Sequence, residues 1–343
     1  MSYTDQRSST STLPDPDPHP GRPARGLTST VPREYVHRAA VSEVFLTGWE
    51  VDATPATDRA EAFTVRAQWP RSHALFARED GYQDPMLLVE SVRQIGSLLA
   101  HAEFGVPFGH QFLLADISCT TAPDLLVAGV VPTEVELRTV CRDIVRRNGS
   151  LCGMRYDVTV LRDGRELATA GASFRCMSPG VYRRVRGDRA AAYTPAPRPA
   201  PPTLAPSAVG HVSARHVVLA EPAPGERNRW ELSVDTAHPT YFDHPVDHVP
   251  GMVLLEAARQ AAHAASGRPD ALVLGLRGEF ARYAELDAPC WIEAHPEPCG
   301  DTDDVRVTVR GTQHDRTLFT AELTVGSRTS NNPATAARTA RTA

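Results

Sequence analysis

The stretch DPMLLVESVRQIG at residues 84–96 returns, without a gap, as PGMVLLEAARQAA at residues 250–262. The flanking residues agree as well, because SHALF at 72–76 precedes the first copy and AHPTYF at 237–242 precedes the second. A duplication of this length predicts two copies of one structural unit within a single chain. Both copies are therefore expected to adopt the same fold.

Each copy is an apolar segment that carries three polar side chains at matching positions. Charged side chains are costly to bury unless they are paired or take part in chemistry. The alternative interpretation is an ordinary ion pair on an exposed helix face, worth roughly a few tenths of a kcal/mol. The apolar neighbours of both sets favour a functional role. The matching residues are Glu90, Arg93 and Gln94 in the first copy, and Glu256, Arg259 and Gln260 in the second.

Composition excludes several classes of protein. The 343 residues carry a formal net charge of −5 without an extended basic face, which argues against nucleic acid as a partner. The nearest basic cluster, YRRVRGDR at 182–189, is interpreted as a solvated domain edge. Six cysteines without metal-ligand spacing predict neither a zinc site nor disulfides, and they favour the reducing cytoplasm. No run of apolar residues is long enough to span a bilayer, so no membrane partner is expected.

Composition also divides the chain into two domains, two tails and a linker. Residues 1–30 and 328–343 lack an apolar period and are predicted to be disordered tails. Prolines in 191–208 predict an extended, semi-rigid linker. The first domain then covers residues 31–190 and the second covers residues 209–327.

Within each domain, one long helix is expected among short β-rich runs. The helices are expected from Asp84 to about residue 103 and from Pro250 to about residue 265, with Asp84 as a cap residue and Gly267 after the second helix. Strands are expected at 61–69, 112–119, 135–147, 153–164 and 165–177, and at 229–235, 273–283, 290–296, 304–313 and 317–325. A long apolar helix among antiparallel strands indicates a curved sheet wrapped around the helix. The predicted class is therefore α+β, a tandem (double) hotdog fold.

Particular motifs carry a family resemblance. The segment YFDHPVDHVPGMVLLEAARQ at 241–260 resembles the signature of hotdog-fold hydroxyacyl-thioester dehydratases. The chain as a whole is more similar to the A-factor biosynthesis family of actinomycetes, whose members carry two hotdog repeats. The segments VHRAAVSEVFLTGW at 36–49, DPMLLVESVRQIG at 84–96 and FGHQFLLADI at 108–117 distinguish it from ordinary dehydratases. The resemblance covers about residues 33–326.

The resemblance implies a particular reaction. A β-ketoacyl group on acyl carrier protein, or on coenzyme A, would be condensed with dihydroxyacetone phosphate on the way to a γ-butyrolactone, butenolide or furan signalling molecule. Such a condensation requires no redox cofactor and no metal. Because isolated hotdog domains build their sites across a dimer interface, the two repeats are expected to pack together as an intramolecular pseudo-dimer, and further oligomerisation stays open.

The chemistry of this reaction suggests roles for the repeated side chains. Attack of an alcohol on a thioester needs a base for the hydroxyl proton and donors for the charge on the carbonyl oxygen. Glu256 and Glu90 are the candidate bases, because burial disfavours the charged form of a carboxylate. The backbone at Gly251 and Met252, where a helix starts, offers candidate oxyanion donors. Gly251 would also let a substrate approach closely.

The cationic and amide side chains of the two helices are candidate substrate contacts. Arg259 and Arg93 stand three residues after their Glu, so each could neutralise that Glu or hold a phosphate or carboxylate. Gln260 is a candidate contact to substrate, and the alternative is that Gln94 and Gln260 satisfy buried backbone groups or the Arg. The sequence leaves open which of the two repeats is active.

Histidines crowd the loop before the second helix. His244 is a candidate catalytic residue and His248 a candidate substrate contact. The alternative is that these residues form turns, while Asp243 and Asp247 cap the approach to the helix. His238 in this loop best matches His73 of the first repeat.

The remaining histidines receive other interpretations. His37 is placed in a strand of the first domain, and His101 and His263 are interpreted as structural. No histidine stands at the spacing from a helical Glu that dehydratases use. Two alternatives nevertheless stay open, namely a dehydratase or thioesterase of the same fold and a non-catalytic module that binds acyl ligands.

Overall fold

The computed structural model describes residues 28–52, 60–76, 80–190, 199–300 and 303–326. The predicted C-terminal tail, nearly all of the predicted N-terminal tail and the first part of the predicted linker lie outside these ranges. The later part of the predicted linker packs on the second repeat, where the Leu204 N–H donates to the carbonyl of Leu219 at 2.9 Å.

The first repeat is an antiparallel sheet with one long helix. Its strands lie in the order β1-β2-β4-β5-β6-β3. The elements are β1 (Leu46–Val51), β2 (Glu61–Trp69), α1 (Pro85–Ala102), β3 (Gln111–Thr121), β4 (Thr133–Arg147), β5 (Ser150–Arg162) and β6 (Arg165–Met177), followed by a short helix, α2 (Pro179–Arg186).

The second repeat has the same plan, with strands in the order β8-β11-β10-β9-β7. Its elements are β7 (Arg229–Glu231), α3 (Gly251–Ser266), β8 (Leu272–Phe280), β9 (Trp291–Pro298), β10 (Val305–Gln313) and β11 (Arg316–Gly326). Short 3-10 helices occur at Arg33–Val36, Val41–Glu43, Pro123–Leu126, Gly187–Ala190, Pro206–Ala208 and Ala214–His216.

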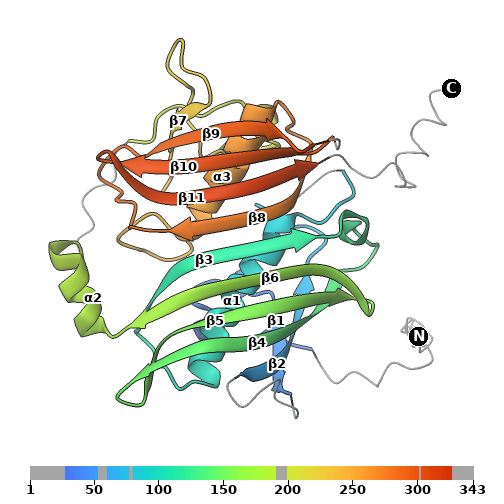
Figure 1. Ribbon diagram of the computed structural model, residues 1–343, viewed down its shortest axis with the longest axis vertical. Coiled ribbons are helices and arrows are strands. Elements are labelled where there is room, and N and C mark those ends of the chain that lie inside the picture. The colour runs from blue at the N-terminus through green and yellow to red at the C-terminus, as the bar shows by residue number, and fades with distance from the viewer. Residues whose placement is uncertain (1–27, 53–59, 77–79, 191–198, 301–302, 327–343) are drawn as a thin grey trace, which may run out of the picture.

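The two repeats share one sheet. Strand β3 pairs antiparallel with β8, with Ile117 opposite Gly278, so that eleven strands form a single sheet. Figure 1 shows α1 and α3 on the same side of this sheet, one behind each half. The predicted double hotdog is therefore confirmed, with the two halves arranged as a pseudo-dimer.

Both long helices begin and end as the sequence predicts. The Asp84 carboxylate caps α1 by accepting a hydrogen bond from the Met86 N–H at 2.9 Å. Helix α3 follows Pro250 and ends at Gly267, whose φ of 66° is the left-handed conformation that glycine adopts without strain. Most side chains of both helices are buried, because the curved sheet covers one side and the other repeat and the loops cover much of the rest.

The duplication persists in details of the loops. The His73 ring accepts hydrogen bonds from the backbone N–H groups of Leu75 and Phe76, at 3.2 and 3.1 Å. His238 makes the same pair of contacts two and three residues further along its own loop, also at 3.2 and 3.1 Å. The predicted match between His73 and His238 is confirmed by this geometry.

Several sequence-based expectations need correction. His37 lies at the end of a 3-10 helix with a φ of 54°, not in a strand. Strand β7 ends at Glu231, four residues earlier than predicted from 229–235. The basic cluster at 182–189 is not simply a solvated edge, because it completes α2 and the side chain of Arg186 is only 3% exposed.

Because β5 packs closely against α1, replacing Gly96 with alanine is predicted to destabilise the fold. Ordinarily, Gly→Ala inside a helix stabilises by about 1 kcal/mol. At Gly96, an added Cβ would lie 2.7 Å from the Tyr156 hydroxyl, which donates to the Val92 carbonyl at 2.7 Å. Gly96→Ala should therefore lower the free energy of unfolding, by about 1–3 kcal/mol in urea titrations. Combining it with Tyr156→Phe should cost less than the sum of the two changes, whereas a stabilising Gly96→Ala would refute this packing.

Candidate active site

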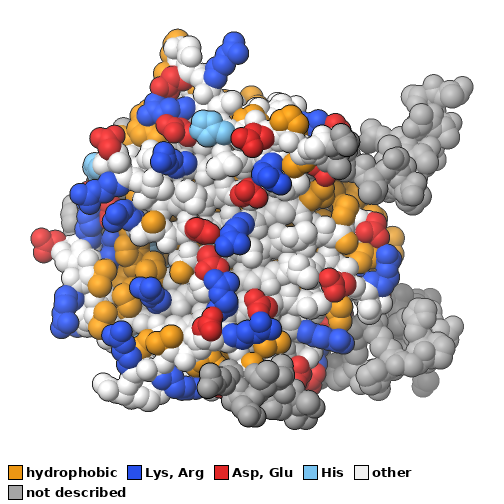
Figure 2. Space-filling view, viewed as in Figure 1, with side chains coloured by type: hydrophobic (Ala, Val, Ile, Leu, Met, Phe, Trp, Pro, Cys, Tyr) orange, Lys and Arg blue, Asp and Glu red, His pale blue; other side chains and the backbone are white. Residues whose placement is uncertain are grey.

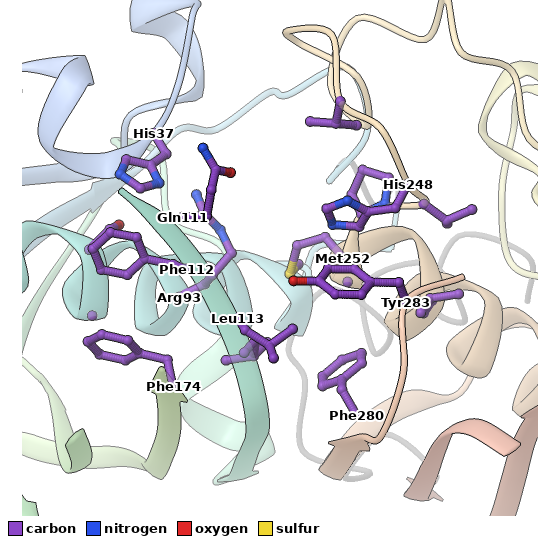
Figure 3. Close-up of a pocket in the computed structure, with 18 of the residues that line it drawn as sticks. His37, Arg93, Gln111, Phe112, Leu113, Phe174, His248, Met252, Phe280 and Tyr283 are labelled. Atoms are coloured by element: carbon purple, nitrogen blue, oxygen red, sulfur yellow. The ribbon is translucent and has the colours of Figure 1, made fainter. Parts of the chain in front are cut away.

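A cavity of about 250 Å³ lies between the two repeats. The first repeat contributes His37, the α1 residue Arg93 and the start of β3, while the second contributes the loop before α3 and the end of β8. Figure 3 shows His37, Gln111 and Phe112 facing His248, Met252 and Tyr283 across this space. A wider opening of about 520 Å³ shares His37, Gln111, His244 and His248 with the cavity and leads outward past α2. The cavity therefore lies at the interface of the pseudo-dimer and opens to the outside through this wider space.

Behind this cavity, Glu90 is completely buried among cations and amides. Its carboxylate accepts from Arg93 at 2.7 Å, from Arg38 at 2.6 Å and from Gln94 at 2.8 Å. Burial raises the pKa of Glu90, but the guanidinium groups of Arg38 and Arg93 outweigh it and hold the pKa at about 2. Arg38 also lies 3.6 Å from Asp243 of the other repeat. Glu90 therefore stays ionised at neutral pH and fixes Arg93 in place.

Glu256 has the corresponding surroundings in the second repeat. Its carboxylate accepts from Arg259 and Gln260, each at 2.7 Å, and contacts the His211 ring at 2.8 Å. Burial raises its pKa, but Arg259 and His211 more than compensate, and the pKa is held well below its usual range. Arg259 pairs in turn with Asp84 of the other repeat at 3.0 Å.

These surroundings correct two expectations from the sequence. The pair of Glu256 and Arg259 is not an exposed ion pair, because both residues are no more than 2% exposed. Burial does not leave Glu256 or Glu90 with a raised pKa, because each carboxylate has cationic partners at hydrogen-bonding distance. Both are thus weak proton acceptors at neutral pH.

The two glutamines follow the structural alternative. Gln94 accepts from the Phe45 N–H at 3.1 Å and donates to the Glu43 carbonyl at 2.7 Å. Gln260 accepts from the Val218 N–H at 2.9 Å and donates to the His216 carbonyl at 2.8 Å. Each amide thereby ties a buried backbone segment to the central helix.

The loop before α3 presents two Asp–His pairs. The Nδ1 atom of His244 lies 2.5 Å from Asp243, and that of His248 lies 2.6 Å from Asp247. A carboxylate on Nδ1 orients the ring and leaves Nε2 available as a proton acceptor. The two aspartates are therefore partners of the histidines, not caps on the approach to the helix. His244 is 43% exposed and His248 is 26% exposed, and both line the cavity.

The start of α3 forms another wall of the cavity. Gly251 and Met252 line it, and the first N–H groups of a helix have no acceptor within the helix. A Cβ added at Gly251 would lie 3.6 Å from Phe280 and 4.0 Å from Leu114, which also line the cavity. Gly251 thus keeps open a space bounded by apolar side chains.

The structure separates the candidate residues into two groups. Arg93, His244, His248, Gly251 and Met252 all line the same cavity. Glu90, Glu256, Arg259 and Gln260 do not line it. Glu256 borders a separate void of about 10 Å³, which is close to the least that holds one water molecule. The open site is therefore built from the helix of the first repeat and the loop of the second.

Some residues of the cavity had no role assigned from the sequence. Arg38 connects Glu90 to Asp243, and no motif of the sequence marks it. The His37 ring lies 2.7 Å from His101, a residue interpreted from sequence as structural. Burial, followed by the charges of His101 and Arg93, lowers the pKa of His37 to about 3. His37 is therefore a neutral ring in the cavity wall.

Comparison with known proteins identifies the family. The A-factor biosynthesis hotdog domain matches residues 21–178 and 192–327. This chain belongs to that family. A Streptomyces virginiae protein named 2-oxo-3-(phosphooxy)propyl 3-oxoalkanoate synthase is 51% identical over 293 residues, covering 85% of this chain and 96% of that protein. A Streptomyces griseus protein of the same name is 39% identical, covering 84% of this chain and 93% of its own length.

Solved structures of other proteins show more distant likeness. A putative oleoyl thioesterase from Lactobacillus plantarum aligns with a TM-score of 0.48 at 10% identity, covering 80% of this chain and 99% of its own. The 12:0-ACP thioesterase from Umbellularia californica aligns with a TM-score of 0.47 at 11% identity, covering 76% of this chain and 93% of its own.

Within the described residues, no helix is both long and apolar enough to cross a membrane.

The low pKa of Glu90 predicts an effect of acid on stability. Because this pKa is lowered from 4.5 to about 2, ionised Glu90 stabilises the folded chain above pH 4.5, and the contribution is lost as the pH falls towards 2. The lowering corresponds to about 3 kcal/mol, at roughly 1.4 kcal/mol per pH unit. Glu90→Gln should therefore lower the free energy of unfolding by about 3 kcal/mol at pH 7 and weaken its pH dependence between 4.5 and 2.

Urea unfolding across this pH range measures both effects. Glu50→Gln is the control, because Glu50 is 57% exposed and pairs with Arg66, which is 51% exposed, so its change should stay within about 0.5 kcal/mol. A Glu90→Gln variant with the stability and acid profile of the unchanged protein would contradict the charge balance described above.

Proposed function

We propose that this chain is a 2-oxo-3-(phosphooxy)propyl 3-oxoalkanoate synthase, an acyltransferase that moves a β-ketoacyl group from a carrier-protein or coenzyme A thioester to dihydroxyacetone phosphate. The observation that carries the proposal is the 51% identity, over almost their whole length, to a relative of that name. The cavity supports it, because histidines, arginines and a helix start meet there beside apolar walls. All six cysteines are free thiols, which supports the cytoplasm as the location.

In the proposed reaction, His244 is the general base. Its Nε2 atom takes the proton from the free hydroxyl of dihydroxyacetone phosphate while that oxygen attacks the thioester carbonyl. The N–H groups of Gly251 and Met252 stabilise the resulting oxyanion. When the tetrahedral intermediate collapses, the C–S bond breaks and the thiolate leaving group takes the proton back from His244. Asp243 keeps the ring in the orientation that both proton transfers need.

The two ends of the substrates have separate places in this proposal. Arg93 binds the phosphate, because its side chain is 22% exposed and lines the cavity, and its guanidinium is already oriented by Glu90. His248 binds the acceptor beside it. The apolar acyl tail lies against the hydrophobic part of the wall, formed by Phe112, Leu114, Phe174, Leu254 and Phe280.

The second buried cluster is assigned a supporting role. Glu256, Arg259 and Gln260 are saturated by one another and by His211 and Asp84. In this proposal they hold the pseudo-dimer together, and Glu90 orients Arg93 without taking up a proton. The half-site formed by Arg93 and the α3 loop performs the reaction.

Product analysis distinguishes this function from its alternatives. Purified protein is incubated with a β-ketoacyl thioester, with and without dihydroxyacetone phosphate, and the products are identified by mass spectrometry. The phosphorylated keto ester should form only when both substrates are present. Acyl release without the acceptor would favour a thioesterase, loss of water from a β-hydroxyacyl thioester would favour a dehydratase, and binding without turnover would favour a ligand-binding module.

Replacement of the proposed base should slow the reaction selectively. His244→Gln should lower kcat by about 100-fold or more, since general base catalysis contributes on that scale. The matched control is His295→Gln, because His295 is an exposed residue of β9 away from the cavity. Initial rates for both variants decide the point, and a His244→Gln enzyme with an undiminished kcat would remove His244 from this role.

The acyl group of the substrate is predicted to occupy the space beside Gly251. Gly251→Val should leave folding intact, because the first added atom makes ordinary contacts, yet it should lower kcat/KM by about 100-fold by displacing the acyl group. Gly48→Val in β1 is the control, because its nearest side-chain atom is 3.7 Å from the added Cβ, a similar clearance. Normal turnover by a folded Gly251→Val variant would place the acyl group elsewhere.

A further inference from the structure

Helix α2 belongs to the first repeat in sequence but contacts the active-site loop of the second. It follows β6 directly and lies at the side of the molecule, next to the ends of β3 and β6 (Figure 1). Tyr182 of this helix also lines the outer mouth of the cavity, together with His244 and His248. The end of the first repeat is therefore in a position to act on the loop of the second.

The contacts converge on the carboxylate of Asp247. The Tyr182 hydroxyl donates to it at 2.6 Å and the Arg186 Nε atom at 3.1 Å, while His248 Nδ1 lies 2.6 Å away. Arg186 also donates to the backbone carbonyl of Asp247 at 3.1 Å. Since a carboxylate offers about four lone-pair positions, these donors leave little freedom for it to turn.

Arg186 is itself fixed by the second repeat. Its two terminal nitrogens make a forked pair with Glu285 at 2.7 and 2.9 Å, and its guanidinium lies 4.3 Å from the centre of the Tyr283 ring. His248 packs edge-on against the same ring, at 4.7 Å between centres, and Tyr182 does so at 6.3 Å. Arg186 therefore holds both the hydrogen-bonding partner and the packing partner of His248.

We propose that Tyr182 and Arg186 are positioning residues, which set the direction and the tautomer of His248 by clamping Asp247. With Asp247 held, Nδ1 of His248 carries the proton and donates it, and Nε2 presents its lone pair to the acceptor substrate in the cavity. This inference rests on the proposed function, in which His248 contacts that acceptor. It assigns the basic segment at 182–189 to the active site of the neighbouring repeat.

The clamp has a direct kinetic test in the full chain. Arg186→Gln and Tyr182→Phe should each raise KM for dihydroxyacetone phosphate by about tenfold, as expected when one well-oriented hydrogen bond is lost, and leave kcat nearly unchanged. Arg186→Lys should restore part of the affinity. Arg184→Gln is the control, because Arg184 is an exposed residue of the same helix, and its KM should not change.

A double-variant cycle separates positioning from general damage. If Arg186 acts through His248, then adding Arg186→Gln to His248→Gln should cause almost no further rise in KM, since the two changes remove the same interaction. Additive effects of the two substitutions would overturn the proposal. Tyr182→Phe combined with His248→Gln gives the same test in a variant that keeps the buried ion pairs.

A spectroscopic readout keeps this inference separate from the reaction itself. Nitrogen chemical shifts of the His248 ring, assigned with His248→Gln, should show one tautomer protonated at Nδ1 in the unchanged protein and a mixture in Arg186→Gln and Tyr182→Phe. Unaltered His248 signals in both folded variants would overturn the clamp, even if the enzyme is active. Altered signals in a chain that makes no phosphorylated ester would support the clamp and refute the proposed function instead.

Discussion

The rest of the structure depends on ion pairs that each repeat makes with the other across their interface. Arg259 of the second repeat pairs with Asp84, the cap of the first helix, while Arg38 of the first repeat reaches Asp243 before the second helix. Each buried glutamate is therefore neutralised by a group that the other repeat helps to hold. Removing one partner from such a network leaves an uncompensated buried charge, which costs several kcal/mol, so neither half is complete alone.

The two halves share a plan but differ in the space beside their central helices. Next to the cavity, α1 carries Gly96 and Ser97, whereas the same positions of α3 carry Ala262 and His263. His263 is buried, and its ring lies 3.2 Å from the carbonyl of Val209. On α1, Tyr156 packs against Gly96 and the cavity reaches Ser97, whereas on α3 the position that corresponds to Ser97 carries the buried ring of His263.

The buried carboxylate of Glu90 does not have the role that its helix alone suggests. A carboxylate in an apolar helix, considered alone, has a raised pKa and makes a useful base. With two guanidinium groups in contact, Glu90 instead becomes a fixed anion that orients Arg93 towards the cavity. Two of the histidines that line the cavity, His244 and His248, are partly exposed and have an aspartate at Nδ1, which is an arrangement that suits proton transfer.

The sequence by itself determined the duplication, the helix starting at Asp84 and most of the strands, because repeats, caps and alternating patterns are local properties of the chain. It also drew attention to Glu90, Arg93, His244 and the glycine at the start of α3. Only the tertiary structure decided which of these residues share a cavity, and that β3 and β8 join two sheets into one. It also revealed that Arg38 connects Glu90 to Asp243. The physical reason is that the interface brings together residues about two hundred positions apart, where burial and ion pairing determine which side chains are charged.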